Sequence, residues 1–377
     1  MNNNQLIKTS LYDLHIEHNA RMVSFAGYEL PIQYKGIVAE HNHTREQVSL
    51  FDVSHMGQLI IKGKDFASTA KALEKIIPAN IIDLQQGEMR YSVLLNENGG
   101  VIDDLIITRP TDKQATDGTI FIVVNGATKA NDFKFMQANL TKEIKISFEE
   151  GKSLLALQGP KAASVLSRFS DIVEKLSFMQ SDATSIKGIG CNISRSGYTG
   201  EDGFEISLNN KDAPKLASIL LDEPEVEFAG LGARDSLRLE AGLCLYGHDM
   251  NEEIDPISAS IIFAIGKHRR LEGGFIGDKK IQQIITNGAK QKRMGIIFEG
   301  RMPVREGAKL VDEQGNKIGY ITSGTFSPIL QKPIAMGYLP TEQAKIGTKT
   351  TAIVRNKQVN GEIVKMPFVA NNYYRGN

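Results

Sequence analysis

The hydrophobic positions between about residues 57 and 221 repeat one series of elements twice. In the first copy the predicted elements are a strand at 58–61, a helix at 66–76, strands at 91–95, 101–108 and 119–125, and a helix at 129–140. In the second copy they are a strand at 153–157, a helix at 161–169, strands at 189–194 and 203–208, and a helix at 212–221. This series predicts two ferredoxin-like α+β units that face each other, the second with one strand fewer.

The pattern changes beyond about residue 284. Six short β-rich segments follow, at 294–298, 308–311, 317–323, 334–339, 350–355 and 361–365. The clearest turn signal between them is Asp-Glu-Gln-Gly-Asn at 312–316. Short strands at this spacing predict a small antiparallel barrel or sandwich.

A chain of 377 residues is long enough for two or three packed units. We expect one region at 1–275, with lobes at about 45–145 and 146–265, and a second domain at 285–377. Hydrophobic content of 41% and charged content of 23% are typical of a globular protein. The 44 basic residues equal the 44 acidic ones, so no basic surplus favours a nucleic-acid partner.

The only two cysteines, Cys191 and Cys244, fit a reducing compartment better than a disulfide-rich protein. The N-terminus shows neither a signal peptide nor an arginine-rich amphipathic run, and no stretch is long and apolar enough to span a bilayer. We therefore expect a cytoplasmic protein without a membrane partner. An organelle from which a leader has been removed is the alternative.

Two adjacent aspartates, Asp103 and Asp104, interrupt an almost continuously apolar strand that follows an Asn-Gly-Gly hairpin signal. A buried carboxylate costs several kcal/mol unless it has a partner. Successive side chains of a strand point to opposite faces, so only one of the pair can enter a given cavity, and alternation does not say which. The alternative is a solvated hairpin whose aspartates bond locally.

A glycine-rich segment at 194–206 carries Tyr198, whose ring offers a stacking face, and Glu205, which can accept hydrogen bonds from ring nitrogens. Three glycines in seven residues permit unusual backbone angles or the close approach of a ligand. A plain acidic loop is equally compatible with this segment alone.

A second glycine-rich turn at 230–233 leads into an amphipathic helix. Arg234 at its start suits a carboxylate ligand, although a surface salt bridge is the alternative. Arg238 and Glu240 are interpreted as structural partners. Gly-Leu-Gly-Ala is a weak dinucleotide signal, because no matching strand-rich unit surrounds it.

The histidines do not favour a metal site. His55 stands alone in the segment 51–57, and His41 and His43 lack further clustered ligands. We expect no metal.

Several segments together resemble the T-protein family of the glycine cleavage system. The matching segments lie at 25–31, 51–57, 99–105, 156–160, 197–205, 230–240, 245–247, 322–328 and 366–368. Two positions depart from the family pattern: Tyr28 stands where many relatives have tryptophan, and Phe263 follows Ile262 where relatives often have a small residue and tryptophan. These departures affect packing more than chemistry.

The resemblance implies a three-domain cloverleaf with folate in its central opening. It implies that the essential carboxylate of the family is Asp104. Folate contacts carry over to Glu205, Arg234, Met56, Tyr91, Asn125, Tyr198, Tyr246 and, near the C-terminus, Tyr373.

The resemblance also implies the reaction of an aminomethyltransferase. The donor would be an aminomethyl group on the lipoyl arm of the H-protein, and the acceptor would be tetrahydrofolate as co-substrate. The P- and L-proteins of the same system would be indirect partners. Such a transfer needs positioning more than a protein nucleophile. Asp104 would orient folate near N10 and stabilise developing positive charge.

Two other functions share this architecture. One is a folate-dependent demethylase of a small methylated substrate. The other is a non-catalytic folate-binding protein of iron–sulfur assembly, whose Lys-Gly-Cys-Tyr-x-Gly-Gln-like motif is replaced here by Arg-Ser-Gly-Tyr-Thr-Gly-Glu at 195–201.

Overall fold

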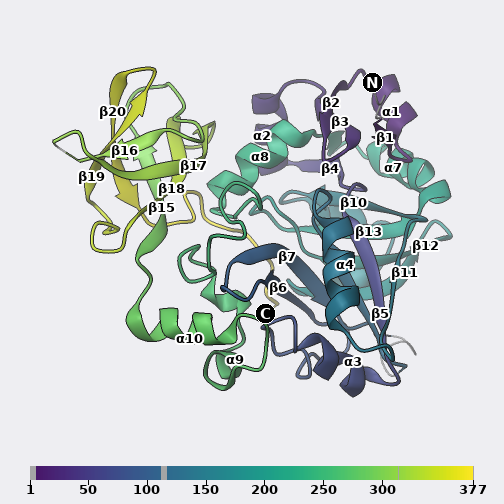
Figure 1. The fold of residues 1–377 in the computed structure, drawn as a ribbon. Coiled ribbons are helices and arrows are strands. Elements are labelled where there is room, and N and C mark those ends of the chain that lie inside the picture. Colours follow the sequence, from purple (N-terminus) through teal and green to yellow (C-terminus); the bar gives the residue numbers. More distant parts are fainter. Residues whose placement is uncertain (1–5, 112–116, 313, 377) are drawn as a thin grey trace, which may run out of the picture.

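A computed structural model describes residues 6–111, 117–312 and 314–376 (Figure 1). The first five residues of the chain and Glu313 of the predicted turn therefore lie outside the described residues. Figure 1 shows a β-rich body formed by the C-terminal part of the chain beside a larger body that holds the other sheets. The helices α9 (Lys267–Glu272) and α10 (Asp278–Asn287) lie in the connection between them.

The first predicted unit forms a five-stranded antiparallel sheet in the order β6-β7-β8-β5-β9. Its elements are β5 (Gly57–Lys62), α3 (Phe66–Leu73), β6 (Met89–Leu95), β7 (Val101–Thr108), β8 (Thr119–Val124), α4 (Lys129–Asn139) and β9 (Lys145–Phe148). The order β7-β8-β5-β9 is that of a ferredoxin-like unit, and β6 extends it as a hairpin with β7. The ferredoxin-like prediction is confirmed, with β9 as a strand that the sequence pattern did not show.

The second predicted unit forms a six-stranded sheet in the order β11-β12-β13-β10-β4-β14. Its elements are β4 (Val48–Asp52), β10 (Lys152–Gln158), α5 (Ala162–Leu166), α6 (Ile172–Lys175), β11 (Gln180–Ile186), β12 (Ile189–Arg195), β13 (Gly203–Asn209), α7 (Ala213–Leu221) and β14 (Val226–Phe228). The expectation of one strand fewer is wrong. Strand β11 reads Gln-Ser-Asp-Ala-Thr-Ser-Ile, too polar for apolar alternation to reveal, and its pairing with β12 holds it in place.

Strand β4 precedes the first unit in the chain but pairs with β10 of the second sheet, for example Leu157 opposite Leu50. Its five residues are all buried, as expected for a strand covered on both faces. The two sheets are therefore interleaved in sequence. The lobe limits at 45–145 and 146–265, and the domain division at 275–285, stay predictions.

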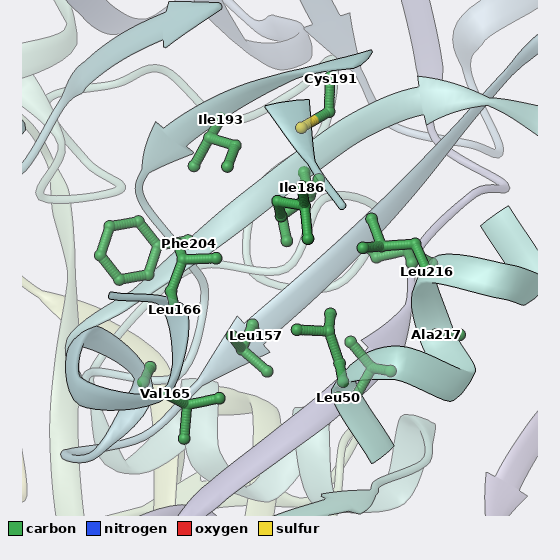
Figure 2. Packing of buried hydrophobic residues seen from close by; sticks show 14 of the residues in the cluster. Leu50, Leu157, Val165, Leu166, Ile186, Cys191, Ile193, Phe204, Leu216 and Ala217 are labelled. Carbon is green, nitrogen blue, oxygen red and sulfur yellow. The ribbon is translucent and has the colours of Figure 1, made fainter. Parts of the chain in front are cut away.

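The core of the second unit lies between this sheet and its helices. Figure 2 shows Leu50 and Leu157 from neighbouring strands, with Leu216 of α7 and Val165 of α5 around them. Burying such a side chain completely stabilises the fold by about 1.5–3 kcal/mol. Because Phe204, Ile206 and Leu208 of β13 belong to this core, the packing also fixes the position from which β13 reaches the candidate site.

An N-terminal three-stranded sheet, in the order β1-β3-β2, was not predicted from the sequence. Its elements and the helices beside it are β1 (Ile7–Lys8), α1 (Tyr12–Glu17), β2 (Arg21–Phe25), β3 (Tyr28–Gln33), α2 (Ile37–Glu46) and α8 (Leu231–Glu240). A Cβ at Gly230 would lie 2.5 Å from the backbone of Ile32, and one at Gly232 would lie 2.6 Å from the side chain of Ile37. These glycines therefore permit α8 to pack closely against β3 and α2.

The C-terminal part forms a closed antiparallel barrel in the order β15-β18-β17-β16-β19-β20. Its strands are β15 (Gln291–Phe298), β16 (Lys309–Val311), β17 (Lys317–Ser327), β18 (Lys332–Pro340), β19 (Lys349–Val354) and β20 (Lys357–Val364). All six predicted segments correspond to these strands, and closure selects the barrel over the sandwich. Ile296, Leu310 and Ile321 are buried in the barrel core.

Helix α8 joins the barrel to the larger body through buried charges. The Arg238 guanidinium donates to an oxygen of Asp249 at 2.7 Å and to Ser323 of β17 at 2.8 Å. Glu240 accepts from Arg45 at 2.9 Å and from Ser327 of the barrel. Arg238 and Glu240 are therefore the structural partners that the sequence suggested. Among the described helices, none is long and apolar enough to cross a membrane.

Candidate active site

One cavity of about 1640 Å³ lies where the two sheets, α8, the barrel and the C-terminal tail meet. All the site residues predicted from the sequence line it: Met56, Tyr91, Asp104, Asn125, Tyr198, Glu205, Arg234, Tyr246 and Tyr373. They come from segments more than 300 residues apart in the chain. The structure thus brings the predicted residues together, while the role of each stays a proposal.

Strand β7 separates the two adjacent aspartates. Buried and partly buried side chains alternate along β7. Asp103 therefore lies on the same face as Leu105 and Ile107, which α3 and α4 cover, and it has no exposed surface. Asp104 points to the opposite face and lines the cavity. The structure therefore answers the question that alternation left open, and excludes a solvated hairpin for Asp103.

Asn125, just after β8, connects both carboxyls. Its side-chain Nδ2 donates to Asp103 Oδ1 at 2.9 Å and to Asp104 Oδ1 at 2.7 Å, and its backbone N–H donates to Asp103 Oδ2 at 3.1 Å. Burial, and then the charge of Asp103, raises the pKa of Asp104 from 3.8 to about 7, against the hydrogen bonds from Asn125 and Tyr91. Near neutral pH, Asp104 can therefore either hold or release a proton.

Glu205 and Arg234 lie on another wall of the cavity. Glu205, on β13, accepts from Ser196 Oγ at 2.8 Å. The Arg234 guanidinium lies 4.8 Å from the centre of the Tyr198 ring, and its buried Nη1 has no hydrogen-bond partner among the described residues. Burial lowers the pKa of Arg234, while the charge of Glu205 opposes this shift. A buried N–H without a partner is suited to an acceptor atom of a ligand.

The glycine-rich segment before β13 is not a plain acidic loop. A Cβ at Gly197 would lie 1.9 Å from Gln158 Oε1, and a Cβ at Gly203 would lie 2.5 Å from Gln158 Nε2, so these glycines permit the segment to pack on Gln158. Its acidic residue Glu201 is buried and accepts from Arg45 at 2.8 Å. The glycines serve close packing of the protein on itself, which fixes Glu205.

Aromatic side chains form the sides of the cavity. Tyr198 donates its hydroxyl hydrogen to the carbonyl of Cys244. Tyr373, on the tail that returns from the barrel, stacks on Phe178 with ring centroids 4.1 Å apart. Aromatic rings that line a cavity are suited to contact with a planar ligand.

Three residues near the cavity escaped the sequence interpretation or were interpreted only as structural. Arg293, on β15, lines the cavity, and its Nε donates to the carbonyl of Ala259 at 2.9 Å. His55 also lines the cavity, and burial, and then Arg234, lowers its pKa to about 4, which keeps the ring neutral. Asp132 of α4 lies outside the cavity, beside Asp103. Arg293 and Asp132 give no sequence signal, because each is a charged residue of an ordinary kind in a strand or helix with other polar residues.

Neither cysteine is suited to nucleophilic attack. Both are free and buried, and burial raises the pKa of Cys191 to about 11 and of Cys244 to about 12, so both thiols stay protonated at neutral pH. His41 is hydrogen-bonded to Ser236 and Glu240. Within residues 6–111, 117–312 and 314–376, no three His, Cys, Asp or Glu side chains are placed to hold a metal ion, and the expectation of no metal stays a prediction.

Curated relatives match the chain over almost its full length. A protein of Dictyostelium discoideum named "Aminomethyltransferase, mitochondrial" is 45% identical over 389 residues, covering 98% of this chain and 94% of the relative. A protein of the same name from Mesembryanthemum crystallinum is 44% identical over 380 residues, covering 98% and 91%.

These relatives contradict the predicted cytoplasmic location, because their names place them in mitochondria. The prediction depended on the sparse cysteines and on the absence of a leader pattern. Sparse cysteines fit any reducing compartment. Since leaders are removed from mature proteins, a sequence without a leader pattern does not exclude an organelle.

Comparison of structures and of family models agrees with the relatives. The crystal structure of glycine cleavage system aminomethyltransferase T from Bartonella henselae superposes with a TM-score of 0.92 at 38% identity, covering 98% of this chain and all of that one. Residues 11–269 match the model of the GCVT N-terminal domain, and residues 291–370 match that of the glycine cleavage T-protein C-terminal barrel domain. The chain therefore belongs to the glycine cleavage T-protein family.

Proposed function

We propose that this protein is the aminomethyltransferase of a glycine cleavage system. It transfers the methylene carbon of an aminomethyl-lipoyl arm to tetrahydrofolate, and the products are ammonia, 5,10-methylenetetrahydrofolate and the free dihydrolipoyl arm. Family membership supports the activity. The observation that carries the proposal is the Asp104 carboxyl, which borders one cavity together with Glu205 and Arg234.

The balance of the reaction shows what the site must do. The carbon leaves one sulfur and one amine nitrogen and forms bonds to N5 and N10 of folate. The two folate N–H protons end on the sulfur and on the released ammonia. No bond to a protein atom is required, and the protonated state of Cys191 and Cys244 agrees with this. The protein contributes by positioning the two reactants and stabilising charge.

Glu205 and Arg234 are proposed to hold the pterin end of the folate. The Glu205 carboxylate can accept from the paired N–H groups of the ring, and the unpartnered Arg234 Nη1 can donate to a ring acceptor. The rings of Tyr91, Tyr198, Tyr246 and Tyr373, with Met56, provide flat and apolar contacts for the ring and the aminobenzoyl group.

Asp104 is proposed to act on the carbon in transfer. When ammonia leaves, the carbon becomes iminium-like and positively charged, and a carboxylate nearby stabilises that charge. The raised pKa of Asp104, about 7, also permits it to exchange a proton with a folate nitrogen near N10. Asn125 donates a hydrogen bond to Asp104. We propose that it orients the Asp104 carboxyl in addition to contacting folate.

The volume of the cavity supports the binding of a second reactant beside folate. Pockets for a single small ligand are typically about 300–1,000 Å³, and this one has about 1640 Å³. Apolar residues at its lining are strongly exposed, with Phe263 at 66% and Ile346 at 64%. We propose that this side of the cavity admits the lipoyl arm of the H-protein, with the P- and L-proteins acting only through that arm.

Ammonia release from aminomethylated H-protein, measured with and without tetrahydrofolate, tests the proposal. We expect release to accelerate strongly when tetrahydrofolate is added, with formation of methylenetetrahydrofolate in equal amount. Folate binding without any release would favour the non-catalytic assembly protein. Demethylation of a small substrate at a rate equal to that with the carrier protein would favour the demethylase.

A further inference from the structure

A third carboxyl lies behind the aspartate pair of β7. Asp132, on α4, has no exposed surface, and neither of its side-chain oxygens has a hydrogen-bond donor among the described residues. It is not part of the cavity lining and so cannot touch a ligand there. A buried carboxylate without donors costs several kcal/mol. The protonated, neutral form of Asp132 is therefore favoured over the ionised form.

Asp103 lies beside Asp132, close enough for a hydrogen bond between the two carboxyl groups. Two carboxyls that share a buried site hold one proton between them, because both cannot be charged at low cost. Burial raises the pKa of Asp103, but Asp103 accepts two N–H groups of Asn125, at 2.9 and 3.1 Å, which oppose this shift and favour its ionised form. The proton therefore resides on Asp132, and burial together with the charge of Asp103 raises the pKa of Asp132 to about 9.

This pair acts on the cavity through one amide group. The side-chain amide of Asn125 has two N–H groups, one of which is directed to Asp103 and the other to Asp104. The ionised Asp103 fixes the orientation of the amide. The amide in turn fixes the Asp104 carboxyl at a separation of 2.7 Å.

We propose that Asp132 is a positioning residue that keeps its proton and donates it to Asp103, so that Asn125 holds the Asp104 carboxyl toward the cavity. This inference rests on the proposed role of Asp104. It places a proton donor three hydrogen bonds away from the reacting carboxyl, outside the reach of substrate.

Other ionisable groups near the cluster do not titrate in the same range. Four side chains are electrostatically coupled to Asp104: Tyr91, Tyr198, Cys244 and Tyr246. Burial raises the pKa of each, that of Cys244 to about 12 and those of the tyrosines above their ordinary range. The pKa of Asp104, about 7, and that of Asp132, about 9, both lie between pH 6 and 10.

Two substitutions separate donation from mere packing. Asp132→Asn keeps an N–H donor for Asp103 and cannot ionise, whereas Asp132→Ala removes the donor. We expect kcat of the parent enzyme to fall above about pH 9, as Asp132 loses its proton. We expect Asp132→Asn to retain kcat within about threefold at neutral pH and not to show this fall. We expect Asp132→Ala to lower kcat by about ten- to a hundredfold, with little change in KM for tetrahydrofolate.

The measurement is kcat and KM between pH 6 and 10, with melting curves and with Asp104→Asn in parallel. The inference is overturned if Asp132→Asn loses as much activity as Asp132→Ala, if both match the parent, or if the alkaline fall persists in Asp132→Asn. If Asp132→Ala does not fold, the pH profile of Asp132→Asn decides alone. An active Asp104→Asn enzyme would instead refute the proposed role of Asp104, whatever the Asp132 variants show.

Discussion

Replacing Asp104 by asparagine removes the charge of the carboxyl while keeping its shape and an oxygen that can accept from Asn125. The burial of Asp104 raises its pKa from 3.8 to about 7. The folded state therefore binds this proton more tightly than the unfolded state. Between about pH 4 and 7 the free energy of unfolding falls as pH rises, because the folded chain must release a proton that the unfolded chain has already lost.

The size of this effect follows from the shift. Three pKa units correspond to at most about 4 kcal/mol of stability that is present at low pH and lost above pH 7. The measured value is expected to be smaller, about 1–3 kcal/mol, because the carboxyl borders a cavity where solvent screens it and because it titrates together with Asp103. Asp104→Asn avoids this cost. The variant should therefore melt at a higher temperature than the parent at pH 8 and at nearly the same temperature at pH 5.

The same substitution should abolish most of the turnover. Loss of a positioned charge or proton carrier typically lowers kcat by about a hundred- to a thousandfold. Tetrahydrofolate affinity should change by less than about tenfold, because Glu205 and Arg234 remain. If Asp104→Asn is more stable but less active than the parent, the buried charge of Asp104 is retained for function and not for stability.

Calorimetric melting at pH 5 and 8, ammonia release from aminomethylated H-protein and titration with tetrahydrofolate together check this prediction. Asp83→Asn, at an exposed aspartate, is the control for loss of one charge. Asp103→Asn should affect turnover less than Asp104→Asn, because Asp103 does not border the cavity. Equal activity of Asp104→Asn and the parent, or a melting difference that is the same at both pH values, would refute the reasoning.

Three further predictions concern the ligand, the donor and the barrel. Glu205→Ala and Arg234→Ala should each weaken tetrahydrofolate binding by about ten- to a hundredfold, since a lost partner of a buried polar contact costs about 1–3 kcal/mol; calorimetric titration checks this, with the half-exposed Glu227→Ala as control. Sarcosine, dimethylglycine and methylated sulfonium compounds should be poor donors in the turnover assay, and rates equal to those with the lipoyl protein would contradict the proposed function. Asp249→Ala should destabilise the protein by about 3–5 kcal/mol, because it removes the buried carboxylate that pairs with the Arg238 guanidinium and leaves only the partly exposed Asp235; an unchanged denaturation midpoint would contradict this.

The hydrophobic pattern predicted most of the helices and strands but fewer of the pairings between strands. The helix predicted at 129–140 is α4, and the helix predicted at 212–221 is α7, within one residue at each end. All six barrel strands were predicted because each contains a short apolar or β-rich run bounded by turn residues. The polar strand β11 and the short β9 were missed, since pairing with a neighbouring strand holds them in place.

For the site, the sequence indicated the residue types and the family indicated which positions matter. Asp103 and Asp104 were both conspicuous as charges in an apolar strand, and the family match favoured the second. Only the fold gives the physical reason, because the helices cover one face of β7 and leave the other face to the cavity. Asp132 gave no signal at all, because an aspartate in a helix is ordinary until a second carboxyl is packed against it.

The sequence by itself determined the α+β units, the barrel and the family, because local periodicity, turn residues and ordered motifs are written along the chain. Only the tertiary structure decided that β4 lies in the second sheet, that Tyr373 returns from the barrel to stack on Phe178, and that Asn125 connects two carboxyls. These contacts join residues that are distant in sequence. Their energies depend on burial and on separations of a few ångströms, which arise only when the whole chain has folded.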